Sequence, residues 1–132
     1  MALRAEEIAL DTSRLVDVLR DDAELADRLE RCARVCIPLF VFAEITAGFL
    51  GGNARTRNQA ALQRFLRENS AEILLPDLET AEHFARLFLQ LRRAGQPIPV
   101  NDLWIAALCL QHRLTLITRD RHFESIPQLL TD

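Results

Sequence analysis

Short apolar runs that alternate with amphipathic segments constrain the fold of this chain more than any other feature. Four runs have the length and composition of buried strands, at residues 7–10, 35–37, 73–75 and 114–117. The intervals between them carry apolar residues at helical spacing. This alternation predicts an α/β fold, a three-layer α/β/α sandwich with a central, mostly parallel sheet of four or five strands.

The expected helices have recognisable ends. Pro38 suits a first helical turn, Gly51 and Gly52 end that helix, and Gly95 with Pro97 stops a later one. The predicted helices run over residues 13–20, from Asp21-Asp22 through Leu29, over 39–50, 55–68 and 79–94, and from Asn101 or Asp102 through Leu110. A short helical turn follows Asp120, and the tail PQLLTD has only a weak pattern. The length of 132 residues fits one domain, 1–132.

Composition excludes several classes of protein. All 16 cationic residues are arginines, so no lysine is present for a P-loop or a lysine-using phosphatase. The three cysteines match no zinc pattern and are expected to be small buried hydrophobes that stay reduced. No apolar run approaches the roughly 18 residues of a membrane span. The N-terminal MALRAEE is too polar and short for a signal peptide, which predicts a cytoplasmic protein.

Four acidic residues form the candidate site: Asp11, Glu44, Asp102 and Asp120. Asp11 and Asp120 follow two predicted strands at the edge where parallel sheets bind ligands. Glu44 has apolar neighbours, so its burial would be costly unless it is paired or bound to a metal. The alternatives for Glu44 are an arginine partner or a helix turned so that the carboxylate reaches solvent. For the three aspartates, the alternative role is capping of a helix N-terminus.

The four acids together are more specific than any one of them. Converging carboxylates repel one another, and a proton or a hard cation is needed to hold them together. Mg²⁺ takes oxygen ligands, activates water and braces a phosphate for in-line displacement. The cluster therefore predicts a metal site, and one metal ion is better supported than two.

At these residues the sequence resembles the PIN domains, and among them the VapC-type toxins of bacterial toxin–antitoxin pairs. The matching segments are LDTS with Asp11, PLFVFAEITAGF with Glu44, PVNDLWIAA with Asp102, and TLITRDRHF with Asp120. The resemblance implies an α/β/α sandwich that binds Mg²⁺ or Mn²⁺ and cleaves single-stranded RNA. It also implies a homodimer that a small cognate antitoxin silences. Asp11, Glu44 and Asp102 would be the main metal ligands, Asp120 would complete the cluster, and Ser13 and Thr118 would support it.

The resemblance has two departures. The tail after Ile126 is short, so we expect a closing fifth strand to be rudimentary. The other departure is at His122. Many members of the family carry a further acid at this position, two residues after the one that matches Asp120. A surface or packing role is the preferred interpretation of His122. The histidine also leaves a complete second metal site without one of its acids.

The formal charge of −3 requires that RNA be held by local arginines. Arg119 and Arg121 flank Asp120 and are the predicted phosphate contacts. The other candidates, for which a solvated helix face is the alternative, are Arg14, Arg55, Arg57, Arg64, Arg67, Arg92 and Arg93.

Two further readings stay open at this stage. The chain could be a catalytically weak or inactive PIN-like module whose main ligand is a protein that inserts an arginine into the acidic pocket. It could also be a structural domain without metal, in which the four acids are scattered caps and salt-bridge partners.

Overall fold

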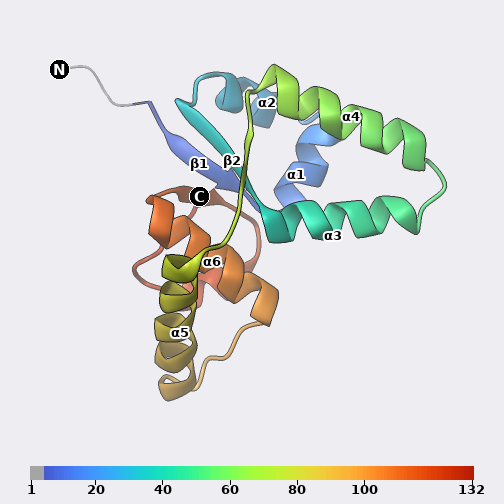
Figure 1. The fold of residues 1–132 in the computed structure, drawn as a ribbon. Helices are drawn as coiled ribbons and strands as arrows, with labels where there is room; N and C mark the ends of the chain where they lie inside the picture. Colours follow the sequence, from blue (N-terminus) through green and yellow to red (C-terminus); the bar gives the residue numbers. More distant parts are fainter. Residues whose placement is uncertain (1–4) are drawn as a thin grey trace.

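A four-stranded, fully parallel sheet organises the fold (Figure 1). The computed structural model describes residues 5–132, and the strand order is β3-β2-β1-β4. The strands are β1 (Glu7–Leu10), β2 (Arg34–Pro38), β3 (Glu72–Leu74) and β4 (Thr115–Ile117). The four predicted strands are therefore confirmed. At most of the strand ends the observed bound differs from the predicted one by a single residue.

Helices cover both faces of this sheet. Figure 1 shows α1, α2 and α4 on one side of the strands, with α5 and α6 on the other. The helices are α1 (Thr12–Leu19), α2 (Ala23–Glu30), α3 (Leu39–Leu50), α4 (Arg55–Glu68), α5 (Leu78–Arg93), α6 (Val100–His112) and the 3₁₀ helix η1 (Arg121–Ser125). The predicted three-layer sandwich is confirmed.

The strands read as apolar runs because they are buried on both faces. Ile8, Ala9 and Leu10 of β1 have no exposed surface, and Leu116 and Ile117 of β4 are equally enclosed. Two of the cysteines, Cys36 and Cys109, lie in the same core as small apolar side chains, while Cys32 is half-buried. All three thiols are free.

Helix α6 begins earlier than the sequence predicts. The expected opening at Asn101 or Asp102 is wrong, because the helix starts at Val100 and its flanking residue is Pro99. Proline holds its φ near −54° and needs no hydrogen-bond partner for a backbone N–H, so it can precede the first turn without a side-chain cap. Asn101 and Asp102 thus lie within the first turn, where their side chains serve other contacts.

The C-terminal tail adds a minimal fifth strand beside β4. The backbone N–H of Leu116 donates to Leu130 at 2.9 Å, and that of Thr118 donates to Asp132 at 3.0 Å. A single parallel bridge joins Leu116 to Thr131. The expectation of a rudimentary fifth strand is confirmed.

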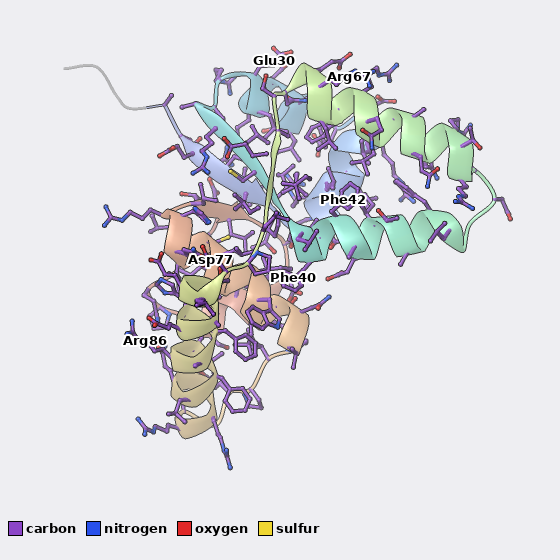
Figure 2. The ribbon with its side chains drawn as sticks, in the orientation of Figure 1. Glu30, Phe40, Phe42, Arg67, Asp77 and Arg86 are labelled. Atoms are coloured by element: carbon purple, nitrogen blue, oxygen red, sulfur yellow. The ribbon has the colours of Figure 1, made fainter. Side chains whose placement is uncertain are left out.

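Stacked aromatic rings connect α3 to the helices on the other side of the sheet. Phe40, in the first turn of α3, points toward α6 (Figure 2) and stacks on Trp104 with ring centroids 5.5 Å apart. Trp104 stacks in turn on Phe84 of α5, at 4.2 Å. This stack fixes α3 relative to α6, and each of these helices carries one of the predicted acids.

Within residues 5–132, no helix has both the length and the apolarity needed to cross a bilayer. The prediction that MALRAEE is not a signal peptide concerns a segment whose first four residues lie outside the described part of the chain.

The turn from α6 into β4 depends on a strained arginine. Arg113 is exposed and has a left-handed backbone with φ 56° and ψ 47°. We expect Arg113→Gly to stabilise the fold by about 1 kcal/mol, since glycine occupies this region without steric cost. Arg86→Gly is the matched control, because Arg86 points into solvent from the middle of α5 (Figure 2) and glycine there costs about 1 kcal/mol. Urea unfolding measures both changes, and an Arg113→Gly variant less stable than the parent protein would contradict the assignment of strain.

Candidate metal centre

The carboxyl ends of β1 and β4 bring two of the predicted acids together. These strands are neighbours in the sheet, with Leu10 opposite Ile117. Asp11 follows β1 directly, and Asp120 follows β4 by three residues. The chain enters α1 on one side of this edge, whereas β4 is reached by the crossover through α5 and α6 from the far side. Such a switch point is where parallel α/β sheets bind ligands.

All four predicted acids line one small pocket at this edge. Its volume is about 80 Å³, and its walls come from the residue after β1, from α1, α3 and α6, and from Asp120 and η1 after β4. The lining residues are Asp11, Thr12, Ser13, Glu44, Asp102, Ile105, Asp120 and Phe123. The structure therefore brings the acids together and does not scatter them, which argues against the structural reading without metal.

Asp11 is the buried member of the cluster, with 5% of its surface exposed. One carboxylate oxygen accepts a hydrogen bond from the backbone N–H of Arg14 at 3.0 Å, which caps α1. The other accepts from the hydroxyl of Thr118. Asp11 thus caps a helix and lines the pocket at the same time, so the two roles weighed for it are compatible.

Thr118 connects two of the acids. Its hydroxyl donates to the Asp11 carboxylate and accepts from the backbone N–H of Asp120 at 2.9 Å. This places Thr118 where a supporting residue is predicted. Ser13 is exposed and lines the pocket.

Glu44 lies in the pocket, but the physical argument made for it from the sequence is wrong. Its side chain is exposed, because α3 turns the small residues Ala43, Ala47 and Gly48 toward solvent along the same face. Glu44 is held by hydrogen bonds: it accepts from Asn101 Nδ2 at 2.7 Å and from Thr12 Oγ1 at 3.0 Å. Sequence reasoning missed both partners, and no local pattern links them to Glu44.

Asp102 does not cap its helix, so the capping role weighed for it is wrong. Its carboxylate Oδ2 lies 3.0 Å from His122 Nδ1 instead. Burial raises the pKa of the Asp102 carboxyl above its ordinary value, the hydrogen bond with His122 lowers it, and the charges of Asp120 and Glu44 raise it further. The neighbouring carboxylates therefore disfavour the charged form of Asp102.

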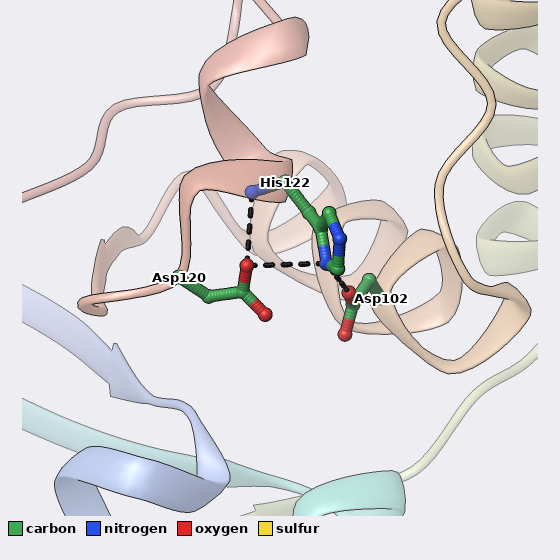
Figure 3. A group of neighbouring side chains, drawn as sticks. All are labelled: Asp102, Asp120 and His122. Atoms are coloured by element: carbon green, nitrogen blue, oxygen red, sulfur yellow. Dashed lines mark hydrogen bonds and ion pairs between the residues drawn. The ribbon is translucent and has the colours of Figure 1, made fainter.

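His122 lies at the surface, as the sequence favours, and it also contacts two of the acids. The ring is exposed, but its Nδ1 points between two carboxylates, 3.0 Å from Asp102 Oδ2 and 3.1 Å from Asp120 Oδ1 (Figure 3). Asp120 Oδ1 also accepts from the backbone N–H of His122 at 2.9 Å. The signal available in the sequence was the two-residue spacing, where the family often places an acid.

The donor set fits a divalent cation. One ligand atom each from Asp102, Asp120 and His122 lies within 4.8 Å of the other two. Burial is the main cause that raises the pKa of the Asp11 carboxyl, and the nearby charge of Asp120 adds to it. Carboxylates crowded in this way gain from a positive centre between them.

Arginines lie beside the acidic pocket and along a larger groove next to it. Arg119, a predicted phosphate contact, forms an ion pair with Asp17, with Nη2 2.9 Å from a carboxylate oxygen. Arg121 is exposed. A larger groove of about 730 Å³ adjoins the acidic pocket, shares Thr12 and Glu44 with it, and carries three arginines, Arg20, Arg57 and Arg64.

The protein is thus a parallel α/β sandwich. Its carboxylates gather at the switch point of the sheet, in an acidic pocket that could hold a metal ion. Comparison with known proteins makes this specific, since the family model for the PIN domain matches residues 8–129. The chain belongs to the PIN domain family.

Similar proteins come from several bacteria. The chain is 29% identical to Ribonuclease VapC5 of Mycobacterium tuberculosis over 117 residues, which covers 89% of this chain and 85% of that protein. A DNA-bound VapBC structure from Salmonella typhimurium superposes with a TM-score of 0.87 at 25% identity, covering 96% and 97% of the two chains. The VapBC-5 toxin–antitoxin structure from Mycobacterium tuberculosis gives 0.73 at 28% identity, covering 96% and 95%.

The buried carboxylate of Asp11 is expected to destabilise the metal-free fold. Because burial raises its pKa above the ordinary 3.8, the folded state is penalised once pH rises past 3.8, and the penalty is complete above the raised pKa. Asp11→Asn keeps a good helix cap and removes the charge. We expect its melting temperature without metal to exceed that of the parent protein at pH 7, with the difference shrinking toward pH 4. The control is Asp27→Asn on the exposed face of α2. The expectation would be contradicted if the melting temperature of Asp11→Asn, taken relative to that of the parent protein, were lower at pH 7 than at pH 4.

Proposed function

We propose that this protein is an endoribonuclease that uses Mg²⁺ or Mn²⁺ to cleave phosphodiester bonds of single-stranded RNA, as the toxin of a toxin–antitoxin pair. The observation that carries the proposal is the convergence of Asp11, Glu44, Asp102 and Asp120 on one pocket. Membership in the PIN domain family and similarity to a VapC ribonuclease support the same activity.

The four acids are the proposed metal and catalytic residues. Asp11, Asp102 and Asp120, with Glu44, would hold one divalent cation. When bound, such an ion lowers the pKa of a coordinated water and offsets negative charge on a phosphate. Thr118 keeps the Asp11 carboxylate oriented toward the pocket, and Asn101 and Thr12 do the same for Glu44. These neutral donors fix the carboxylates without taking away their charge.

RNA is proposed to lie along the groove that adjoins the pocket. Arg57 and Arg64 of α4 line this groove, and both side chains are exposed. Arg64 has only a loose contact with Glu68, at 3.9 Å between exposed side chains, so its guanidinium is available to a phosphate. Two local cations of this kind would hold a phosphate chain despite the net charge of −3.

Partners and location belong to the same proposal. The solved VapBC structures support a small cognate antitoxin as the protein partner. Exposed apolar side chains between the end of β3 and the start of α6 support a homodimer. They are Leu75, Leu78, Phe88, Leu89 and Val100. Three free cysteines suit the reducing cytoplasm, where we place the protein.

Loss of one pocket carboxylate should abolish RNA cleavage while the fold survives. We expect Asp102→Asn and Asp11→Asn to cut cleavage of a labelled single-stranded RNA in Mg²⁺ or Mn²⁺ by more than about 100-fold, above the 10–100-fold typical of losing an outer-shell partner. Asp27→Asn, purified in the same way, is the control. Undiminished cleavage by the pocket variants would mean a contaminant or another site. Metal binding without cleavage of any RNA would favour the protein-binding module.

The groove arginines should contribute to RNA affinity through counterion release. In an Asp102→Asn background that cannot cleave, we expect Arg57→Ala with Arg64→Ala to weaken single-stranded RNA binding. The slope of log affinity against log salt should fall by about 1.4, which is about 0.7 for each lost phosphate contact. Arg92→Ala with Arg93→Ala removes the same charge from the end of α5 and serves as control. Equal losses in the two double variants would rule out a role for this groove.

A further inference from the structure

We infer that His122 is itself a metal ligand in this chain, and that its ring nitrogen makes the site prefer a transition-metal ion such as Mn²⁺ over Mg²⁺. The inference rests on the proposed function in one respect, since it concerns the same metal site. It concerns the residue at which the chain departs from the acidic pattern it resembles.

The first observation is the spacing of the donor atoms. His122 Nδ1 lies 3.0 Å from Asp102 Oδ2 and 3.1 Å from Asp120 Oδ1, and the two carboxylates come from different elements, α6 and the segment after β4 (Figure 3). Adjacent ligands in an octahedral site with bonds of about 2.1 Å are separated by about 3.0 Å. Both contacts of Nδ1 therefore have the spacing of neighbouring ligands around one ion.

The second observation is that polar contacts direct the ring toward the pocket. The His122 side chain is 52% exposed, yet its Nδ1 faces the two carboxylates and not solvent. Its backbone N–H is anchored to Asp120 Oδ1 at 2.9 Å, which fixes the start of the side chain beside that carboxylate. An Nδ1–H donates to these oxygens in the absence of metal, and the same nitrogen without its proton directs a lone pair to the place that the two carboxylates share, where a cation would bind.

The chemistry of the nitrogen decides the class of ion. Mg²⁺ takes oxygen ligands and is reluctant to lose its waters. Imidazole suits the later transition-metal ions best, and Mn²⁺, the first of that series, takes carboxylate oxygen as Mg²⁺ does but accepts a nitrogen ligand more readily. A site with carboxylates and one imidazole therefore discriminates against Mg²⁺ more than a site made of carboxylates alone. Because the family often has an acid at this position, the histidine would change ion selectivity without removing a ligand.

The test compares metal binding by the full chain, without RNA, in the parent protein, His122→Ala and His122→Asp. Calorimetric titration with Mn²⁺ and with Mg²⁺ gives the two affinities, and their ratio measures selectivity. Electron spin-echo spectroscopy of bound Mn²⁺ detects a directly coordinated nitrogen. His83→Ala, which changes a histidine on α5, is the matched control.

We expect nitrogen coupling to Mn²⁺ in the parent protein and in His83→Ala, and its loss in both His122 variants. His122→Ala should weaken Mn²⁺ binding by about tenfold or more, on the scale of the 10–100-fold cost of losing even an outer-shell partner. His122→Asp should retain Mn²⁺ binding and strengthen Mg²⁺ binding, so that the ratio of the two affinities falls. Absence of nitrogen coupling in the parent protein, or an unchanged affinity ratio in His122→Asp, would overturn the inference.

The outcome is separable from that of the proposed activity. Nitrogen coupling in a protein that cleaves no RNA would uphold the ligand assignment and contradict the ribonuclease. RNA cleavage that requires Mn²⁺ or Mg²⁺, with no nitrogen coupling, would support the ribonuclease and contradict the assignment of His122 as a ligand.

Discussion

The site depends on the parallel pairing of β1 with β4. This pairing sets Leu10 opposite Ile117, so the residues that follow the two strands meet at one edge of the sheet. It also requires that the chain cross from β3 to the far side of β1, and the crossover consists of α5 and α6. The same crossover carries Asp102 to that edge. If β4 paired elsewhere, Asp11 and Asp120 would each cap a helix and no pocket would form.

Gathering carboxylates at this edge costs stability, and the structure offsets the cost only in part. Thr118 and the backbone of Arg14 donate to Asp11, and Asn101 and Thr12 donate to Glu44. These donors orient the charges, but burial still raises the pKa of Asp11 and of Asp102. The remaining cost is what a cation would relieve, so the affinity of such a site for metal and its instability without metal have the same cause.

Capping and pocket lining are not exclusive roles for an aspartate. Asp11 accepts from the backbone of α1, and Asp120 accepts from the first turn of η1, while both line the pocket. A carboxylate has several lone pairs, which allows this: the two oxygens of Asp11 have different partners, whereas Oδ1 of Asp120 contacts both the helix backbone and His122. A cap therefore says little against a functional role, and Asp102 makes no capping hydrogen bond although it lies in the first turn of α6.

The sequence by itself determined the layers of the fold and the positions of Asp11 and Asp120, because strand and helix periodicity and the chemistry of strand ends are local. It did not determine how α3 and α6 turn their side chains. Only the tertiary structure shows that Glu44 is exposed and held by Asn101, and that His122 points between Asp102 and Asp120. The contacts of Glu44 with Asn101 and of His122 with Asp102 join residues 57 and 20 apart in the chain. They are decided by how helices pack across the sheet, through contacts such as the stack of Phe40 on Trp104, and no local pattern records that packing.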